Sequence, residues 1–166
     1  MADASSIRYA ATLPAATGRN KGAVRFDTTN SVAKVSDGSN WVKFSVGPVA
    51  SYIQSGTFAT TTFFVAPQAC KVTAVSEVHS TAGSDGGAVT AVVTKDTGTD
   101  APGAGTSLHQ SGSFNMKGTA NTVQNATLST TAATLTLAAG DRLAVKLTGT
   151  PTAVAGAVVS AQLAWL

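Results

Sequence analysis

Few side chains in this sequence belong to the types that carry out catalysis or bind metals. The two histidines, His79 and His109, lie far apart, and neither has a Cys, Asp or Glu at the spacing of a zinc site. Glu77 is the only glutamate, so a pair of catalytic glutamates cannot form, and no motif supports an Asp–Glu pair. We therefore interpret both histidines as polar residues near strand ends.

Two loops and one cysteine complete the search for chemistry. Asp96 and Asp100 lie on a Gly-containing loop of the kind that calcium prefers, but the loop lacks further acids and the EF-hand spacing. The turn at 84–87 lacks the lysine of a phosphate-binding loop. Cys70 has no partner for a disulfide within the chain, and we interpret it as a small buried hydrophobe. We expect no enzymatic activity, no metal and no cofactor.

The charge of the chain is low and unevenly placed. Charged residues make up 11% of the chain, and the net charge is +3. The whole excess lies before residue 44, where six basic residues face three acidic ones: Arg8, Arg19, Lys21, Arg25, Lys34 and Lys43 against Asp3, Asp27 and Asp37. This placement indicates either an N-terminal arm that binds an acidic partner or a solubilising tail.

Two classes of partner are not expected. Tyr9, Phe26 and Trp41 accompany the basic residues, but Phe26 alternates with polar neighbours as a core residue does, and the segment is less basic than a nucleic-acid-binding domain. No stretch approaches the length of a membrane span, and the N-terminus has no apolar core of a signal peptide. We expect no nucleic acid, no membrane, and synthesis in a cytoplasm without secretion.

The elements that position these residues are expected to be strands. Hydrophobic residues make up 43% of the chain and aromatic ones only 6%, so small aliphatic side chains must form the core. Threonine and valine are β-branched and favour a pleated surface. We expect an all-β protein with three parts: an extended arm over 1–22, a three-stranded β-meander over 23–47, and a β-sandwich of jelly-roll type over 48–166.

The meander is predicted from alternation and turn signals. Strands are expected at 23–27, 32–35 and 41–46, with an Asp-Gly turn before the third strand. One face carries Val24, Phe26, Val42 and Phe44. Three short strands are marginal alone, so this module is expected to pack on a neighbour or on further copies of the chain. The sandwich strands are expected at 56–67, 70–79, 88–95, 123–128, 135–137, 143–147 and 154–165.

Two motifs carry a resemblance to known proteins. The stretches 22–29 and 35–41, with an aromatic-Asp-Thr strand end, an Asp-Gly turn and Trp41, resemble a hairpin module of tailed-bacteriophage structural proteins. The stretch 135–150 is similar to jelly-roll domains of phage decoration and head-fibre proteins. The resemblance implies a symmetric oligomer, often a trimer, that is attached to the virion by its N-terminal part.

These observations predict a capsid decoration (cement) protein on the virion surface. It would bind the major capsid protein and stabilise the assembled shell through an attachment site: Ile7, Arg8, Tyr9, Leu13, Arg19, Lys21 and Arg25. The alternative is a head-fibre or tail-fibre domain that binds a host receptor or glycan. Its loops at 80–87 and 96–116 would then hold the ligand, with Phe114 as the aromatic platform.

Overall fold

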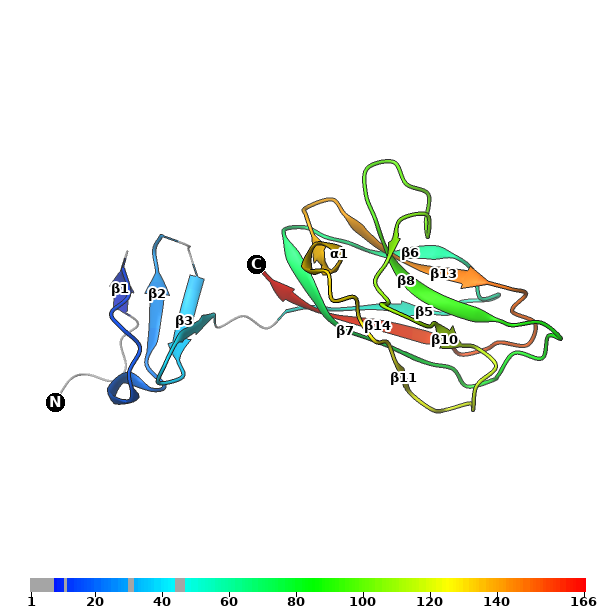
Figure 1. The fold of residues 1–166 in the computed structure, drawn as a ribbon, viewed down its shortest axis with the longest axis horizontal. Helices are drawn as coiled ribbons and strands as arrows, with labels where there is room; N and C mark the ends of the chain where they lie inside the picture. Colours follow the sequence, from blue (N-terminus) through cyan, green and yellow to red (C-terminus); the bar gives the residue numbers. More distant parts are fainter. Residues whose placement is uncertain (1–7, 11, 30–31, 44–46) are drawn as a thin grey trace. The chain divides into compact units, whose positions relative to one another are not determined.

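The computed structural model (Figure 1) describes residues 8–10, 12–29, 32–43 and 47–166. The chain divides into two compact units, Met1–Val46 and Gly47–Leu166. Both units are built from β-strands, and the protein is nearly all β.

The N-terminal unit is a small four-stranded sheet. Its elements are β1 (Arg8–Ala10), the short 3-10 helix η1 (Gly18–Asn20), β2 (Val24–Asp27), β3 (Val32–Ser36) and β4 (Trp41–Lys43). The strand order is β1-β2-β3-β4; β1 runs parallel to β2, and the other pairs are antiparallel. Strands β2, β3 and β4 are the meander expected from the sequence.

Strand β1 differs from the expectation of an unpaired arm over 1–22. Its three residues pair with β2, so the sheet has four strands and not three. A strand of three residues is too short to show alternation, and a parallel neighbour leaves no tight-turn signal in the sequence. Part of the segment before Ala23 therefore belongs to the sheet.

The turn between β3 and β4 follows from its Asp-Gly sequence. Gly38 adopts a φ of +100°, which glycine accepts without strain. The Asp37 carboxylate accepts hydrogen bonds from the backbone N–H groups of Asn40 (2.6 Å) and Ser39 (2.7 Å). These two bonds, with a smaller contribution from the charge of Lys21, lower the pKa of Asp37 and keep it ionised.

The second unit contains the remaining elements. They are β5 (Val49–Ile53), β6 (Thr61–Val65), β7 (Cys70–Val78), β8 (Thr90–Asp96), β9 (Thr106–Ser107), β10 (Phe114–Asn115), β11 (Gln124–Asn125), the single helical turn α1 (Ala132–Leu135), β12 (Thr136–Leu137), β13 (Arg142–Thr148) and β14 (Val158–Trp165).

The strands of this unit form two antiparallel sheets that pack face to face. One sheet has the order β11-β7-β14-β5, with β12 also on β7. The other has the order β10-β8-β13-β6, with β9 also on β8. Along the chain, β5, β6, β7 and β8 alternate between the two sheets, as do β13 and β14, and β10 and β11 form one edge of each sheet (Figure 1). These two orders are those of a jelly roll, as the sequence analysis expected.

Aliphatic side chains fill the space between the sheets. In the central strands, Val72, Val93, Val145 and Val159 are fully buried, and Leu143 lies beside them. The alternation of β7 is interrupted at Thr73, where its pairing with β14 shifts by one residue. This bulge returns the following residues of β7 to the inward face.

The strand β5 is absent from the sequence prediction. It begins directly after Gly47-Pro48 and spans only five residues, so in the sequence it could not be distinguished from the linker at this boundary. Gly47 is required where it stands, because a Cβ atom there would lie 1.5 Å from the carbonyl oxygen of Leu163 on β14. The predicted strand at 56–67 is also shorter in the structure, where β6 covers Thr61–Val65.

A loop covers the outer face of the β8–β13 sheet. Asp96 ends β8 on that face, yet it is fully buried. Its carboxylate accepts hydrogen bonds from the Thr94 hydroxyl (2.8 Å) and from the backbone N–H groups of Gly103 (2.9 Å) and Gly105 (3.0 Å). The Arg142 guanidinium donates to two carbonyl oxygens in the same loop. Asp96 is therefore the anchor of this loop.

Replacement of Asp96 by Ala is expected to destabilise the sandwich by about 3 kcal/mol. It leaves the N–H groups of Gly103 and Gly105 without this acceptor, and the buried Thr94 hydroxyl keeps only its 3.5 Å contact with the Ala144 carbonyl oxygen. Urea denaturation measures the change. Asp100→Ala is the matched control, because Asp100 is exposed in the same loop and its removal costs less. Equal effects of the two substitutions would contradict the role of Asp96.

Candidate functional site

The small sheet of the N-terminal unit has one apolar face. Val24, Val35 and Val42 form a cross-strand row, and Phe26 pairs with Ala33 on the same face. Val24 is 39% exposed and Val42 47% exposed, so this face is only partly covered. Large apolar side chains left this open on a small sheet are typical of a surface that binds another chain.

The opposite face of this sheet is held by the segment that precedes β2. The Trp41 indole N–H donates to the carbonyl oxygen of Pro14 (2.6 Å). The Asn20 side chain joins three points: its oxygen accepts from the Thr17 backbone N–H (2.8 Å) and the Ser36 hydroxyl (3.0 Å), and its amide donates to Ala15. These contacts tie residues 14–20 to β3 and β4.

The charged groups of this unit are unequally neutralised. Lys34 forms an ion pair with Asp27 (2.7 Å), which is buried. The guanidinium of Arg25 lies 5.9 Å from the centre of the Trp41 ring, a cation–π contact. Its Nε atom is buried without a hydrogen-bond partner. Arg19 and Lys21 are exposed. Among the basic side chains that the structure describes in this unit, Arg19, Lys21 and Arg25 are the candidates to meet an acidic partner, and Lys21 also lies close enough to Asp37 to lower its pKa.

The residues expected to form the attachment site have different positions. Arg8 and Tyr9 lie on β1, in register with Arg25 and Phe26 of β2. Leu13 is half-buried. The structure brings Val24 and Val42 into one row, as expected for the apolar face. Ile7 and Phe44 lie outside the described residues.

The sandwich contains a buried polar pair that the sequence analysis missed. His79 Nδ1 lies 2.9 Å from Glu77 Oε1, and both side chains are fully buried. The Gln124 amide donates to the second Glu77 oxygen (2.7 Å), and His79 Nε2 lies 3.2 Å from the Gly118 carbonyl oxygen. Because that oxygen only accepts, His79 Nε2 carries a proton.

This network has a structural role. Burial raises the pKa of Glu77, against the smaller lowering effect of its bonds to His79 and Gln124. Both side chains are closed to substrate, and their bonds link β7 to β11 and to the turn at Gly118. The available signal was the i, i+2 spacing of Glu77 and His79, which places both on one face of a strand.

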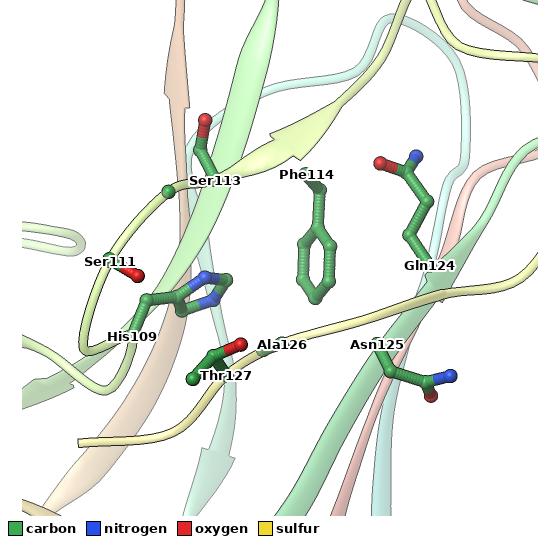
Figure 2. A pocket seen from close by; sticks show the side chains of 9 residues that line it. His109, Ser111, Ser113, Phe114, Gln124, Asn125, Ala126 and Thr127 are labelled. Atoms are coloured by element: carbon green, nitrogen blue, oxygen red, sulfur yellow. The ribbon is translucent and has the colours of Figure 1, made fainter. Parts of the chain in front are cut away.

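His109 lines a small hollow on the surface of the sandwich, between residues 109–114 and 124–127. The hollow measures about 120 Å³ and lies between the loop at 110–114 and β11, among Ser111, Ser113, Asn125 and Thr127. Figure 2 shows the His109 ring beside Phe114. The two rings are arranged edge to face, with 4.9 Å between their centroids. The hollow is small for a ligand pocket, which usually exceeds about 300 Å³.

Phe114 does not offer the stacking platform that the glycan alternative requires. Only 2% of its surface is exposed, because it packs in the core below the His109 ring. The hollow presents mainly hydroxyl and amide groups at its rim.

The other chemical candidates also have structural surroundings. Cys70 is buried at the start of β7, and burial raises the pKa of its thiol, with a smaller effect from the charge of Asp141. The described residues contain no group of three or more His, Cys, Asp or Glu side chains that could hold a metal. Within the same ranges, no helix has the length and apolar character needed to cross a membrane.

Comparisons of the chain with protein-family models, with curated proteins and with solved structures find no match. The geometry alone therefore defines the candidate site, which is the apolar and basic surface of the N-terminal unit.

His109 is expected to make stability depend on pH. Its Nε2 accepts the Val93 N–H (3.2 Å), so the neutral ring carries its proton on Nδ1, and burial lowers its pKa below the ordinary 6.5. Between the lowered pKa and about 6.5, the unfolded chain binds more protons. The contribution of His109 is therefore complete above pH 6.5 and decreases as the pH falls through this window.

The measurement is the free energy of unfolding at about pH 7.5 and about pH 5, for the wild type and His109→Gln. The variant is expected to lose less stability on acidification. Glu77 acts in the opposite direction, because its stabilising contribution is lost as the pH rises above 4.5 through its raised pKa. This contribution is present in both the wild type and the variant, so it cancels when their changes in stability are subtracted. An NMR titration that places the His109 pKa at or above 6.5 would contradict the prediction.

Proposed function

We propose that this protein is a tailed-bacteriophage capsid decoration protein that binds the assembled shell through its N-terminal unit. The observation that carries the proposal is the contrast between the two units. The N-terminal unit holds the net positive charge and a sheet too small to enclose a core of its own, whereas the sandwich is electrically balanced and encloses a complete core, although apolar residues such as Ile53 are also exposed on it. Attachment and solvent-facing body are thus separate parts of the chain.

The mechanism requires no chemistry. Val24, Val42 and the arm residues before Ala23 would bury apolar surface on the major capsid protein or on sister copies, and Arg19, Lys21 and Arg25 would face its acidic groups. Binding to the assembled shell, and not to free subunits, stabilises the shell by mass action. The jelly roll supports this assignment by analogy, because viral capsid proteins use the fold, but the fold alone does not determine function.

The alternative is a fibre domain that binds a host-surface receptor or glycan with the sandwich loops. The hollow beside His109 is the feature that favours it. The buried position of Phe114 counts against it. The number of copies in purified particles separates the two functions, because a decoration protein is abundant and a fibre protein is scarce.

Charge reversal in the N-terminal unit is expected to weaken binding to particles that lack this protein. Arg19→Glu and Lys21→Glu together should reduce affinity about tenfold or more at low salt, with a smaller effect at high salt. Lys71→Glu with Lys146→Glu makes the same change in charge on the sandwich and should leave binding unchanged. A truncated chain that starts at Val49 and binds as tightly as the full chain would refute the attachment model.

The apolar face is expected to hold a homotrimer together. Light scattering should give about three times 16.5 kDa for the full chain. Val24→Asp with Val42→Asp should give a monomer, because charges replace the exposed apolar row. Val65→Asp, at a valine of the sandwich that is more exposed than either, is the control. A wild-type monomer at micromolar concentration and on the virion would show that the trimer is wrong.

A further inference from the structure

The edge strand β5 lacks the features by which proteins protect sheet edges from pairing. Edges are commonly guarded by charge, by bulges or by shortness. Among the described edges of the sandwich, β10 and β11 have only two residues each, and β6 is bulged against β13. Strand β5 has five uncharged residues and pairs with β14 without a register shift.

The outer edge of β5 presents a full set of backbone groups. The Gln54 N–H donates to Ala157, and the Leu163 N–H donates to Pro48, so the even-numbered residues of this segment face β14. Hydrogen-bonding directions alternate along a strand. The N–H and C=O groups of Val49, Ser51 and Ile53 therefore point away from the sheet. No described strand pairs with them.

The side chains of β5 are arranged with approximate symmetry about Ser51, so that the strand complements an antiparallel copy of itself. Reading outward from Ser51, Ala50 mirrors Tyr52 and Val49 mirrors Ile53. In an antiparallel pair centred on Ser51, the small side chain of Ala50 lies beside the large one of Tyr52 on the inner face. On the outer face, the apolar side chains of Val49 and Ile53 lie beside each other. Since the strand has no charge, no like charges meet in this arrangement.

The outer face of the sheet carries a row of apolar side chains that reaches the edge at β5. Val49 is 63% exposed and Ile53 70% exposed, the largest values among the exposed apolar residues of the described chain. Ile53 lies in register with Val158 of β14, which lies in register with Val78 of β7. Pairing at the β5 edge would cover part of Val49 and Ile53 and extend this apolar row into a second molecule.

We propose that β5 pairs with β5 of a second copy of this chain, about a two-fold axis through Ser51. The two sheets then form one continuous sheet across two sandwiches, with Val49 of each copy opposite Ile53 of the other. Val49, Ser51 and Ile53 of each copy supply the hydrogen bonds that close the pair. The interface is self-complementary, as a two-fold contact must be.

This inference concerns the sandwich and is independent of the proposed attachment to a capsid. A contact of two five-residue strands is weak alone, and crowding many copies on one surface would strengthen it. The test below uses the purified full chain without particles. Failure of capsid binding therefore leaves the pairing proposal intact, and failure of pairing leaves the attachment proposal intact.

Disulfide trapping tests the register directly. Ser51 faces its own copy across the axis at about 5.5 Å between Cα atoms, within the range that a disulfide spans. Ser51→Cys should therefore yield covalent dimers on mild oxidation. Val49→Cys and Ile53→Cys should each give few dimers alone, whereas an equimolar mixture should place about half of the chains in mixed dimers. The native Cys70 is fully buried and does not interfere.

The controls separate pairing from collision. Ser160→Cys lies one strand inward on the same face, too far from its symmetry mate to cross-link. In the Val49→Cys and Ile53→Cys mixture, an added Ser51→Lys should reduce cross-linking at least tenfold by opposing like charges at the axis, and Ser51→Thr should not. Circular dichroism verifies folding. Equal cross-linking at all positions, or none at Ser51 above the Ser160 control, would overturn the proposal.

Discussion

The structure depends on how closely two sheets can approach when their inward side chains are small. The core between β7–β14 and β8–β13 contains mostly valine, alanine and leucine, and few aromatic residues take part. Small β-branched side chains lose little rotamer freedom on burial and pack well on a pleated surface. The long central strands therefore supply the burial that a chain with 6% aromatic residues could not obtain from a few large anchors.

Three of the buried polar groups of the sandwich fasten a loop at the end of a long strand. Asp96 ends β8 and accepts the N–H groups of the following loop, and Glu77 with His79 ends β7 and binds Gln124 of β11. A buried carboxylate is costly unless it is hydrogen-bonded, so these contacts specify one position for each loop.

Much of the fold was predictable from local patterns, and the failures have physical causes. The alternation of β7, β13 and β14 and the Asp-Gly turn at Gly38 identified the strands and the hairpin. Strand β1 was missed because its partner is parallel and its three residues show no period. Strand β5 was hidden by the Gly-Pro boundary before it.

For the candidate site, the sequence indicated the apolar face and its charge. It did not indicate the stacking of Arg25 on Trp41, because that contact joins strands that are not neighbours. The bond from Trp41 to Pro14 was hidden for a similar reason, since it links residues far apart in the sequence. Contacts of this kind follow from tertiary structure and leave no local pattern.

Gly47 has a consequence for how this chain can be recombined. The backbone of β14 passes so close to it that no side chain fits, which makes this glycine the first fixed point of the sandwich. The residues that fill the sandwich core all follow it in the sequence. A different N-terminal module could therefore be joined ahead of Gly47 without altering one core residue, whereas a junction placed even one residue later would remove the glycine on which the close approach to β14 depends.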